Sequence, residues 1–190
     1  MDWQKWRTLF PVTEKYIYLN HAAVSPISCR TQAAMNAFLV HATHYGFENF
    51  DPWFNQIESC RGLVARLIGA STDEIAFTKN TTQGLILAAN GIQWQDGDNV
   101  IITEAEFPAN VYPWWNLKDL GLETRMVAEK DKRILVDDIE AAIDDKTRAV
   151  SISHVEFASG FRNDLHQIGE ICQTKNLWFV VDAIQSLGVL

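Results

Sequence analysis

The sequence has little positive charge and no long apolar run. Its 190 residues contain 16 lysines and arginines against 24 acidic residues, with a formal net charge of -8 and a pI near 5.0. This acidic balance argues against a surface for nucleic acid or anionic membranes. No apolar run approaches the ~20 residues of a membrane helix, and the polar start, residues 1–7, lacks the apolar core of a signal peptide. We therefore expect a cytoplasmic protein with neither a nucleic acid nor a membrane as partner.

Cysteine is also scarce. The three cysteines, Cys29, Cys60 and Cys172, are scattered, odd in number and without the paired spacing of a metal site. Reduced thiols and no bound metal are the expectation. With hydrophobic residues at 47% and charged residues at 21%, the composition is that of an ordinary globular domain with a sizeable core.

The glycine patterns of nucleotide sites are missing too. A predicted helix start at Thr78-Lys79-Asn80-Thr81-Thr82-Gln83-Gly84 has neither the glycines of a Walker loop nor those of a dinucleotide fingerprint. This absence disfavours one alternative, a doubly wound dinucleotide-binding domain.

From residue 74 onward, short apolar runs alternate with helical patterns. The runs predict strands at 75–78, 99–103, 122–127, 149–153 and 177–181, and the patterns between them predict helices at 81–90, after Pro113, at 136–143 and at 165–175. This alternation predicts a three-layer α/β/α fold with a mainly parallel sheet covered on both faces.

The first part of the chain is predicted to be helical. One helix spans about 28–45, with an apolar stripe of Met35, Phe38, Leu39 and Ala42. A second begins with Asp51 as N-cap and Pro52 at its first position. We therefore divide the chain into an N-terminal helical segment with an active-site entrance loop, residues 1–72, and a first part of a ligand-binding large domain, residues 73–190.

The last predicted strand ends in a carboxylate. Leu177 to Val181 is an unbroken apolar run, typical of a strand buried on both faces, and Asp182 follows at its carboxyl end, where open α/β sheets bind ligands. A structural alternative is a helix N-cap at Asp182 with Gln185 as its reciprocal partner.

Two further segments carry candidate ligand contacts. Amides at a helix start form an anion site, and the hydroxyls of Thr81 and Thr82 would add donors there, although a simple helix cap has the same pattern. Phe107, after another strand, could stack on a planar ring or merely cover the core. In a parallel sheet, these places share one edge. A phosphate site, an aromatic plane and a carboxylate together suit pyridoxal 5'-phosphate (PLP).

Five short motifs occur in this order along the chain: Tyr18 to Ala23, Thr78 to Gly84, Glu106 to Asn110, Ser153 to Glu156 and Val181 to Gln185. Through them the chain resembles the class V aminotransferase and cysteine desulfurase group of fold-type I PLP enzymes. The resemblance implies that Thr81 and Thr82 hold the phosphate and that Phe107 stacks on the ring. It also implies that Asp182 pairs with the pyridine nitrogen, that Gln185 reaches the ring hydroxyl, and that Asn20 and His21 border the substrate pocket.

The sequence departs from this family in three places. Desulfurases of the family usually carry His where Phe107 stands and Asn where Phe157 stands. The family's Schiff-base lysine lies beyond the segment matching Asp182 to Gln185, so the chain is expected to be an incomplete fold-type I large domain that ends before it. Lys79 is expected at the surface or beside the phosphate.

The resemblance implies a PLP-dependent enzyme that acts on an amino acid, with class V aminotransferase as the leading prediction. A cysteine desulfurase, lyase or epimerase of the same family is the first alternative, and a truncated chain without catalysis is the second. Whether the 190 residues alone are an enzyme stays open at this point. The family resemblance further implies a homodimer.

Overall fold

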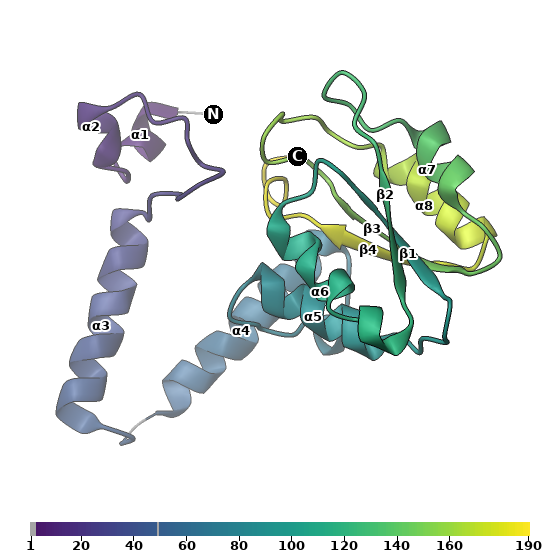
Figure 1. The fold of residues 1–190 in the computed structure, drawn as a ribbon. Helices are drawn as coiled ribbons and strands as arrows, with labels where there is room; N and C mark the ends of the chain where they lie inside the picture. The colour runs from purple at the N-terminus through teal and green to yellow at the C-terminus, as the bar shows by residue number, and fades with distance from the viewer. Residues whose placement is uncertain (1–2, 49) are drawn as a thin grey trace. The chain divides into compact units, whose positions relative to one another are not determined.

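The computed structural model describes residues 3–48 and 50–190. The chain forms two compact units, Met1–Ala76 and Phe77–Leu190. The first contains the helices α1 (Trp3–Arg7), α2 (Val12–Lys15), α3 (Cys29–Tyr45) and α4 (Asp51–Ile68) and the 3-10 turn η1 (Thr72–Glu74) (Figure 1).

In the first unit, the local sequence predicts the ends of the two long helices, α3 and α4, to within about a residue. The side chain of Ser28 caps α3 by accepting a hydrogen bond from the amide of Thr31 at 3.1 Å. The predicted N-cap of α4 is wrong by one residue, because Asp51 is already helical and Phe50 is the flanking residue. Gly69 ends α4 with a φ of 70°, a left-handed conformation that glycine adopts without strain.

The apolar stripe predicted on α3 does not face a core. No residue of α3 is buried, and Met35 and Leu39 are more than half exposed. Phe38 instead meets Trp53 of α4 edge to face, with the ring centroids 5.1 Å apart. Among the described residues, no helix is both long and apolar enough to cross a membrane.

The second unit is built on a parallel sheet. Its helices are α5 (Thr81–Gly91), α6 (Tyr112–Trp115), α7 (Val136–Ala142) and α8 (Leu165–Thr174), its strands are β1 (Asn99–Thr103), β2 (Glu123–Val127), β3 (Thr147–Ser153) and β4 (Trp178–Asp182), and η2 (Pro108–Asn110) and η3 (Lys118–Leu120) are 3-10 turns. The four-stranded sheet of the described residues has the order β2-β1-β3-β4, and every neighbouring pair is parallel.

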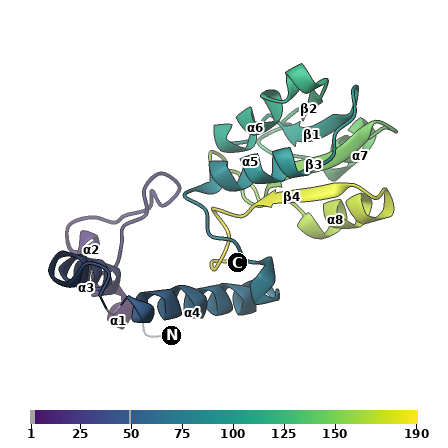
Figure 2. The same cartoon turned by 90° about the horizontal axis from the view of Figure 1, so that it is seen from below.

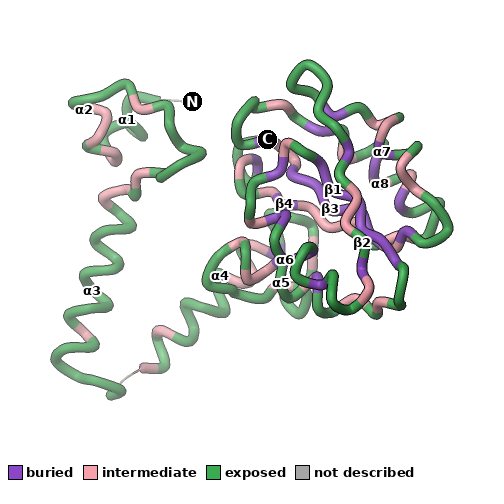
Figure 3. Tube along the Cα trace, viewed as in Figure 1, coloured by how far each residue is buried: buried purple, intermediate pink, exposed green. Residues whose placement is uncertain are grey.

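Side chains of β1 alternate between two cores, one on each face of the sheet. Val100 and Ile102 pack with Trp114 of α6 and with α5, whereas Ile101 packs with α7 and α8 through residues such as Ile139. The two helix pairs accordingly lie on opposite sides of the strands (Figure 2), and β1 and β3 are the most buried part of the chain (Figure 3). The predicted three-layer α/β/α architecture is confirmed.

Two of the predicted strands differ from the structure. Residues 75–78 form no strand, and the boundary between the two units falls within them. Four of the five residues of β4 are not buried, and Trp178 is 64% exposed. The reason is position: β4 pairs with β3 alone in the described sheet and forms its edge.

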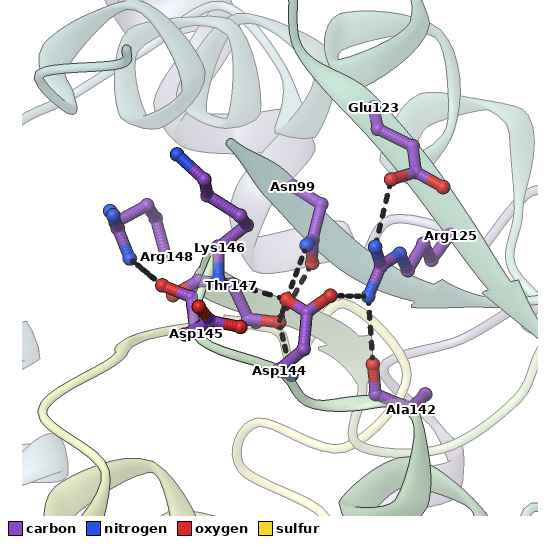
Figure 4. Close-up of polar contacts among 9 residues, drawn as sticks. All are labelled: Asn99, Glu123, Arg125, Ala142, Asp144, Asp145, Lys146, Thr147 and Arg148. Carbon is purple, nitrogen blue, oxygen red and sulfur yellow. Dashed lines mark hydrogen bonds and ion pairs between the residues drawn. The ribbon is translucent and has the colours of Figure 1, made fainter. Parts of the chain in front are cut away.

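A polar network joins the amino ends of β1, β2 and β3. Asp144 accepts hydrogen bonds from Asn99 at 2.9 Å and from Arg125 at 2.6 Å, Thr147 donates to Asn99 at 2.8 Å, and Arg125 also pairs with Glu123 (Figure 4). The hydrogen bond from Asn99 and the guanidinium of Arg125 hold the pKa of the Asp144 carboxyl well below its usual range. These bonds tie three strands together at the edge opposite the carboxyl ends.

Candidate functional site

Asp182 is buried at the carboxyl end of β4. Only 5% of it is exposed, and its Oδ1 accepts a hydrogen bond from the amide of Ile184 at 2.9 Å. Burial raises the pKa of this carboxyl, and the Ile184 amide opposes the rise only in part. Residues 184–189 form turns and no helix, so Asp182 caps a turn through this hydrogen bond. A carboxylate held in this way gains from a cationic hydrogen-bond donor beside it.

A second carboxyl group, that of Glu106, lies at the end of β1. Its oxygens accept hydrogen bonds from Ser153 at the end of β3, at 2.6 Å from the amide and 2.7 Å from the hydroxyl. Burial raises the pKa of Glu106, and the negative charge of Asp182 adds to the rise. The two carboxyl groups are therefore close enough for their charges to interact.

Glu156, just after β3, is the third buried carboxyl group at this edge. Burial, with the charge of Glu106, raises its pKa to about 7. The side-chain amide of Asn163 donates to it at 2.7 Å and to the carbonyl of Ser153 at 2.8 Å. Acidic groups with raised pKa values thus gather at one edge of the sheet, a pattern typical of functional sites.

The amino end of α5 carries the predicted anion site. The side chain of Asn80 accepts from the amide of Gln83 at 2.9 Å, and Gln83 accepts in turn from the amide of Lys79 at 2.8 Å. The first amides of a helix have no acceptor inside it. Within the described residues, those of Thr81 and Thr82 donate no hydrogen bond. These donors, with the helix dipole, suit an anion.

One cavity of about 500 Å³ is lined by residues of both α5 and β4. Thr81 and Asp182 both line it. The rest of its lining is mainly apolar: Gly84, Leu85, Val180, Val181, Ala183, Ile184 and Leu187. A hollow of this size, mostly apolar with a few polar groups, is typical of small-molecule sites.

The other predicted cofactor residues do not line this cavity. Thr82 is exposed on the first turn of α5, and Gln185 is partly buried within the turns that follow Asp182. Phe107 is 49% exposed at the start of η2 and meets Phe157 edge to face. It directly follows Glu106, whose carboxyl group is hydrogen-bonded to Ser153, the residue of β3 that is opposite Asp182 in the sheet.

The predicted substrate residues belong to the first unit. Asn20 and His21 are exposed, and the ring of His21 meets that of Tyr18 edge to face at 5.4 Å. Their contact with substrate stays a prediction. Lys79 is exposed and is not among the residues of the cavity wall.

Sequence reasoning missed Glu106, Ser153 and Glu156 as site residues. All three lie within the motifs quoted above, but Glu106 and Ser153, which bond to each other, are 47 positions apart. For Glu106 and Glu156, the available signal was a carboxylate close behind a buried strand, the same signal that identified Asp182.

Comparison with known proteins identifies the family of the chain. Residues 17–189 match the family model "Aminotransferase class-V". A probable cysteine desulfurase of Methanothermobacter thermautotrophicus is 31% identical over 94% of the chain and 46% of its own length, and an uncharacterized aminotransferase of Schizosaccharomyces pombe is 32% identical over 98% and 48%. The chain thus spans about half the length of these curated relatives.

Solved structures show the same fold. The apo structure of a cysteine desulfurase from Thermococcus onnurineus NA1 has a TM-score of 0.84 and 29% identity, and the alignment covers 96% of this chain and 48% of that one. A cysteine desulfurase from Escherichia coli has a TM-score of 0.87 with 22% identity, over 98% and 50% of the two chains. With a family match over nearly its whole length and this fold, the chain belongs to the class V aminotransferase family.

Proposed function

We propose that the cavity between α5 and β4 binds PLP and that the protein acts on an amino acid. The observation that carries the proposal is that Thr81 and Asp182 line the same cavity. An anionic phosphate suits the free amides of the α5 start, and a protonated pyridine nitrogen suits a buried carboxyl group. The chemistry that PLP supplies when bound is withdrawal of electrons from the substrate's α-carbon.

The chain's own residues would hold the cofactor in distinct ways. Thr81 and Thr82 would bind the phosphate through hydroxyl and amide donors. Asp182 would accept the hydrogen bond of the ring nitrogen, and its charge would keep the proton there. Phe107 would stack on the ring, and Gln185 would reach the ring hydroxyl. Asn20 and His21 are proposed to border the amino-acid substrate, and the complete protein is proposed to be a homodimer.

Binding of pyridoxamine 5'-phosphate tests the cofactor site without requiring catalysis. We expect Asp182→Asn to weaken binding by about ten- to a hundredfold in calorimetry, since hydrogen bonds to charged groups are worth about 1.5–3 kcal/mol. Thr81→Val should weaken it by up to about tenfold, and pyridoxamine without its phosphate should lose most of its affinity and show no dependence on Thr81.

The exposed residues Asp119 and Thr174 supply matched controls, Asp119→Asn and Thr174→Val, which should bind like the parent protein. Binding that survives Asp182→Asn unchanged would show that the ring nitrogen has another partner. A protein that does not bind pyridoxamine 5'-phosphate at all would refute the proposed site.

Transamination is the reaction that we propose first. Phe107 and Phe157 stand where desulfurases of the family carry His and Asn, and a phenyl ring can neither donate nor accept a proton. Cysteine desulfuration is the second candidate, supported by the relatives and solved structures that are named cysteine desulfurases. The two reactions leave different products.

The test is to load the complete protein with PLP and supply single amino acids. Transamination transfers the amino group to the cofactor, so pyridoxamine 5'-phosphate and an oxo acid should form from a suitable donor. Desulfuration would release sulfide from cysteine in the presence of a reducing agent and leave the cofactor as PLP. Sulfide release from cysteine without formation of pyridoxamine 5'-phosphate from any amino acid would overturn the first candidate.

A further inference from the structure

Two loops at the carboxyl edge of the sheet are fixed by hydrogen bonds. The loop that carries Phe107 is bonded to β3 on both sides of that residue. Glu106 accepts two hydrogen bonds from Ser153, and the side chain of Asn110 accepts from the hydroxyl of Ser151 at 2.6 Å. Ser151 and Ser153 are two positions apart on β3, so they face the same side of the strand. Phe107 is therefore presented by a loop with little freedom to shift.

The two ends of the loop that carries Phe157 are bonded to each other. Val155 and Arg162 form an antiparallel bridge, and the amide of Glu156 donates to the carbonyl of Phe161 at 2.9 Å. Inside this closure, the buried carboxyl group of Glu156 accepts from the side chain of Asn163. The position of Phe157 is thus set by backbone and buried side-chain bonds.

The two loops meet through their phenyl rings. The centroids of Phe107 and Phe157 are 5.0 Å apart and the ring planes stand at 82°, an edge-to-face geometry in the favourable range. The side chains stay 49% and 42% exposed. In such a pair, at least one face of Phe107 is not in contact with Phe157, so that face can receive another flat ring.

We propose that Phe157 is a positioning residue that holds the ring of Phe107 in the plane on which the cofactor's pyridine ring stacks. The inference rests on the proposed function, because it needs a flat ligand over Phe107. An unsupported phenyl side chain half exposed at a loop would rotate about its χ angles, and ordering it on binding would cost conformational entropy. The ring contact with Phe157 supplies that order before the ligand arrives.

The test compares three changes at one position in the whole protein, with pyridoxamine 5'-phosphate as the probe. Phe157→Ala and Phe157→Leu remove the aromatic ring, and we expect each to weaken binding by about three- to tenfold, the range set by an aromatic pair. Both should also reduce the circular dichroism that the protein induces in the absorption band of the bound probe, because its ring would no longer be held in one orientation. Phe157→Tyr keeps the aromatic ring, so this variant should bind the probe and give circular dichroism like the parent protein.

A double-mutant cycle separates positioning from a general effect on the loop. In a Phe107→Ala background, Phe157→Leu should change affinity by less than twofold, since the ring that it positions is gone. Trp115→Leu is the matched control: Trp115 is 44% exposed in another edge-to-face pair, with Tyr112, and its loss should not affect binding. Thermal unfolding of each unliganded variant shows that the fold is retained.

Three results would overturn the proposal. The first is equal affinity and equal circular dichroism for Phe157→Leu and the parent protein while Asp182→Asn still weakens binding; the proposed function would then stand without this role of Phe157. The second is an undiminished effect of Phe157→Leu in the Phe107→Ala background. The third is a parent protein that does not bind the probe, which would remove the proposed function as well.

Discussion

At the scale of single residues, Glu156 is a buried carboxyl group whose ionisation the fold changes strongly. It is 1% exposed, and burial together with the charge of Glu106 raises its pKa to about 7. Glu129 and Asp182 add further negative charge around it, and Asn163 is its hydrogen-bond donor. At neutral pH, roughly half of the folded molecules therefore carry a proton on this side chain.

This pKa predicts how stability depends on pH. In the unfolded chain a glutamate ionises near its ordinary pKa of 4.5, so between about pH 4.5 and 7 the unfolded state binds fewer protons than the folded state. The free energy of unfolding should consequently fall as pH rises through this window, by on the order of 3 kcal/mol for Glu156 alone. Glu156→Gln should remove that part of the slope, as measured by urea unfolding at a series of pH values.

In the Glu156→Gln variant, the free energy of unfolding should still fall with rising pH, because the pKa values of Glu106 and Asp182 are raised too. The control is Glu140→Gln, at an exposed position of α7, which should leave the pH profile unchanged. Parallel profiles for Glu156→Gln and the parent protein would contradict the raised pKa.

At the scale of elements, two turns that lie close together constrain the backbone just before β2. Gly121 ends η3 with a φ of 82°, and its carbonyl accepts from the amide of Gly97, which has a φ of 81°. A Cβ atom at Gly121 would lie 2.1 Å from Oδ1 and 3.1 Å from Cα of Asp96, whereas a Cβ atom at Gly97 would meet nothing within 4 Å. The two glycines thus share a backbone conformation but differ in the space around them.

Alanine substitutions can separate the cost of a left-handed backbone conformation from the cost of steric crowding. Gly97→Ala should destabilise the protein by about 1 kcal/mol, the cost of a left-handed alanine. Gly121→Ala should cost about 2–4 kcal/mol, because Asp96 must also move. Equal losses in the free energy of unfolding, measured in urea, would mean that the Asp96 side chain turns away at no cost.

At the scale of the whole molecule, the buried core belongs to the second unit. Every residue of β1 is buried, and both hydrophobic clusters lie around the sheet, whereas α3 has no buried residue. In the first unit, among the described residues, Ala65 is the buried apolar side chain. Stability should therefore be distributed unevenly along the chain.

Hydrogen exchange measured by mass spectrometry can show this distribution. Amides of β1 and β3 should exchange most slowly, through global unfolding, and those of α3 should exchange at least about a hundredfold faster, through local opening. Helix α8 is the internal control, since it buries Ile168 and Cys172 against the sheet and should be protected like the strands. Equal protection of α3 and β1 would show that α3 is covered in solution.

Local sequence determined most of the elements. Asn80 before Thr81, Gly69 after α4 and the β-branched run at Val100 to Ile102 act within a few residues of themselves, so their effects can be predicted without the fold. Asp182 was identifiable for the same reason, because a carboxylate directly after a buried strand needs a partner wherever the strand lies.

The tertiary structure alone decided which of these residues meet. The cavity shared by Thr81 and Asp182 and the bond between Glu106 and Ser153 depend on the strand order β2-β1-β3-β4. The same order places β4 at the edge and leaves Trp178 exposed in a run that looks fully buried. Pairing between strands is a contact between distant segments, and periodicity within one segment carries no information about its neighbours.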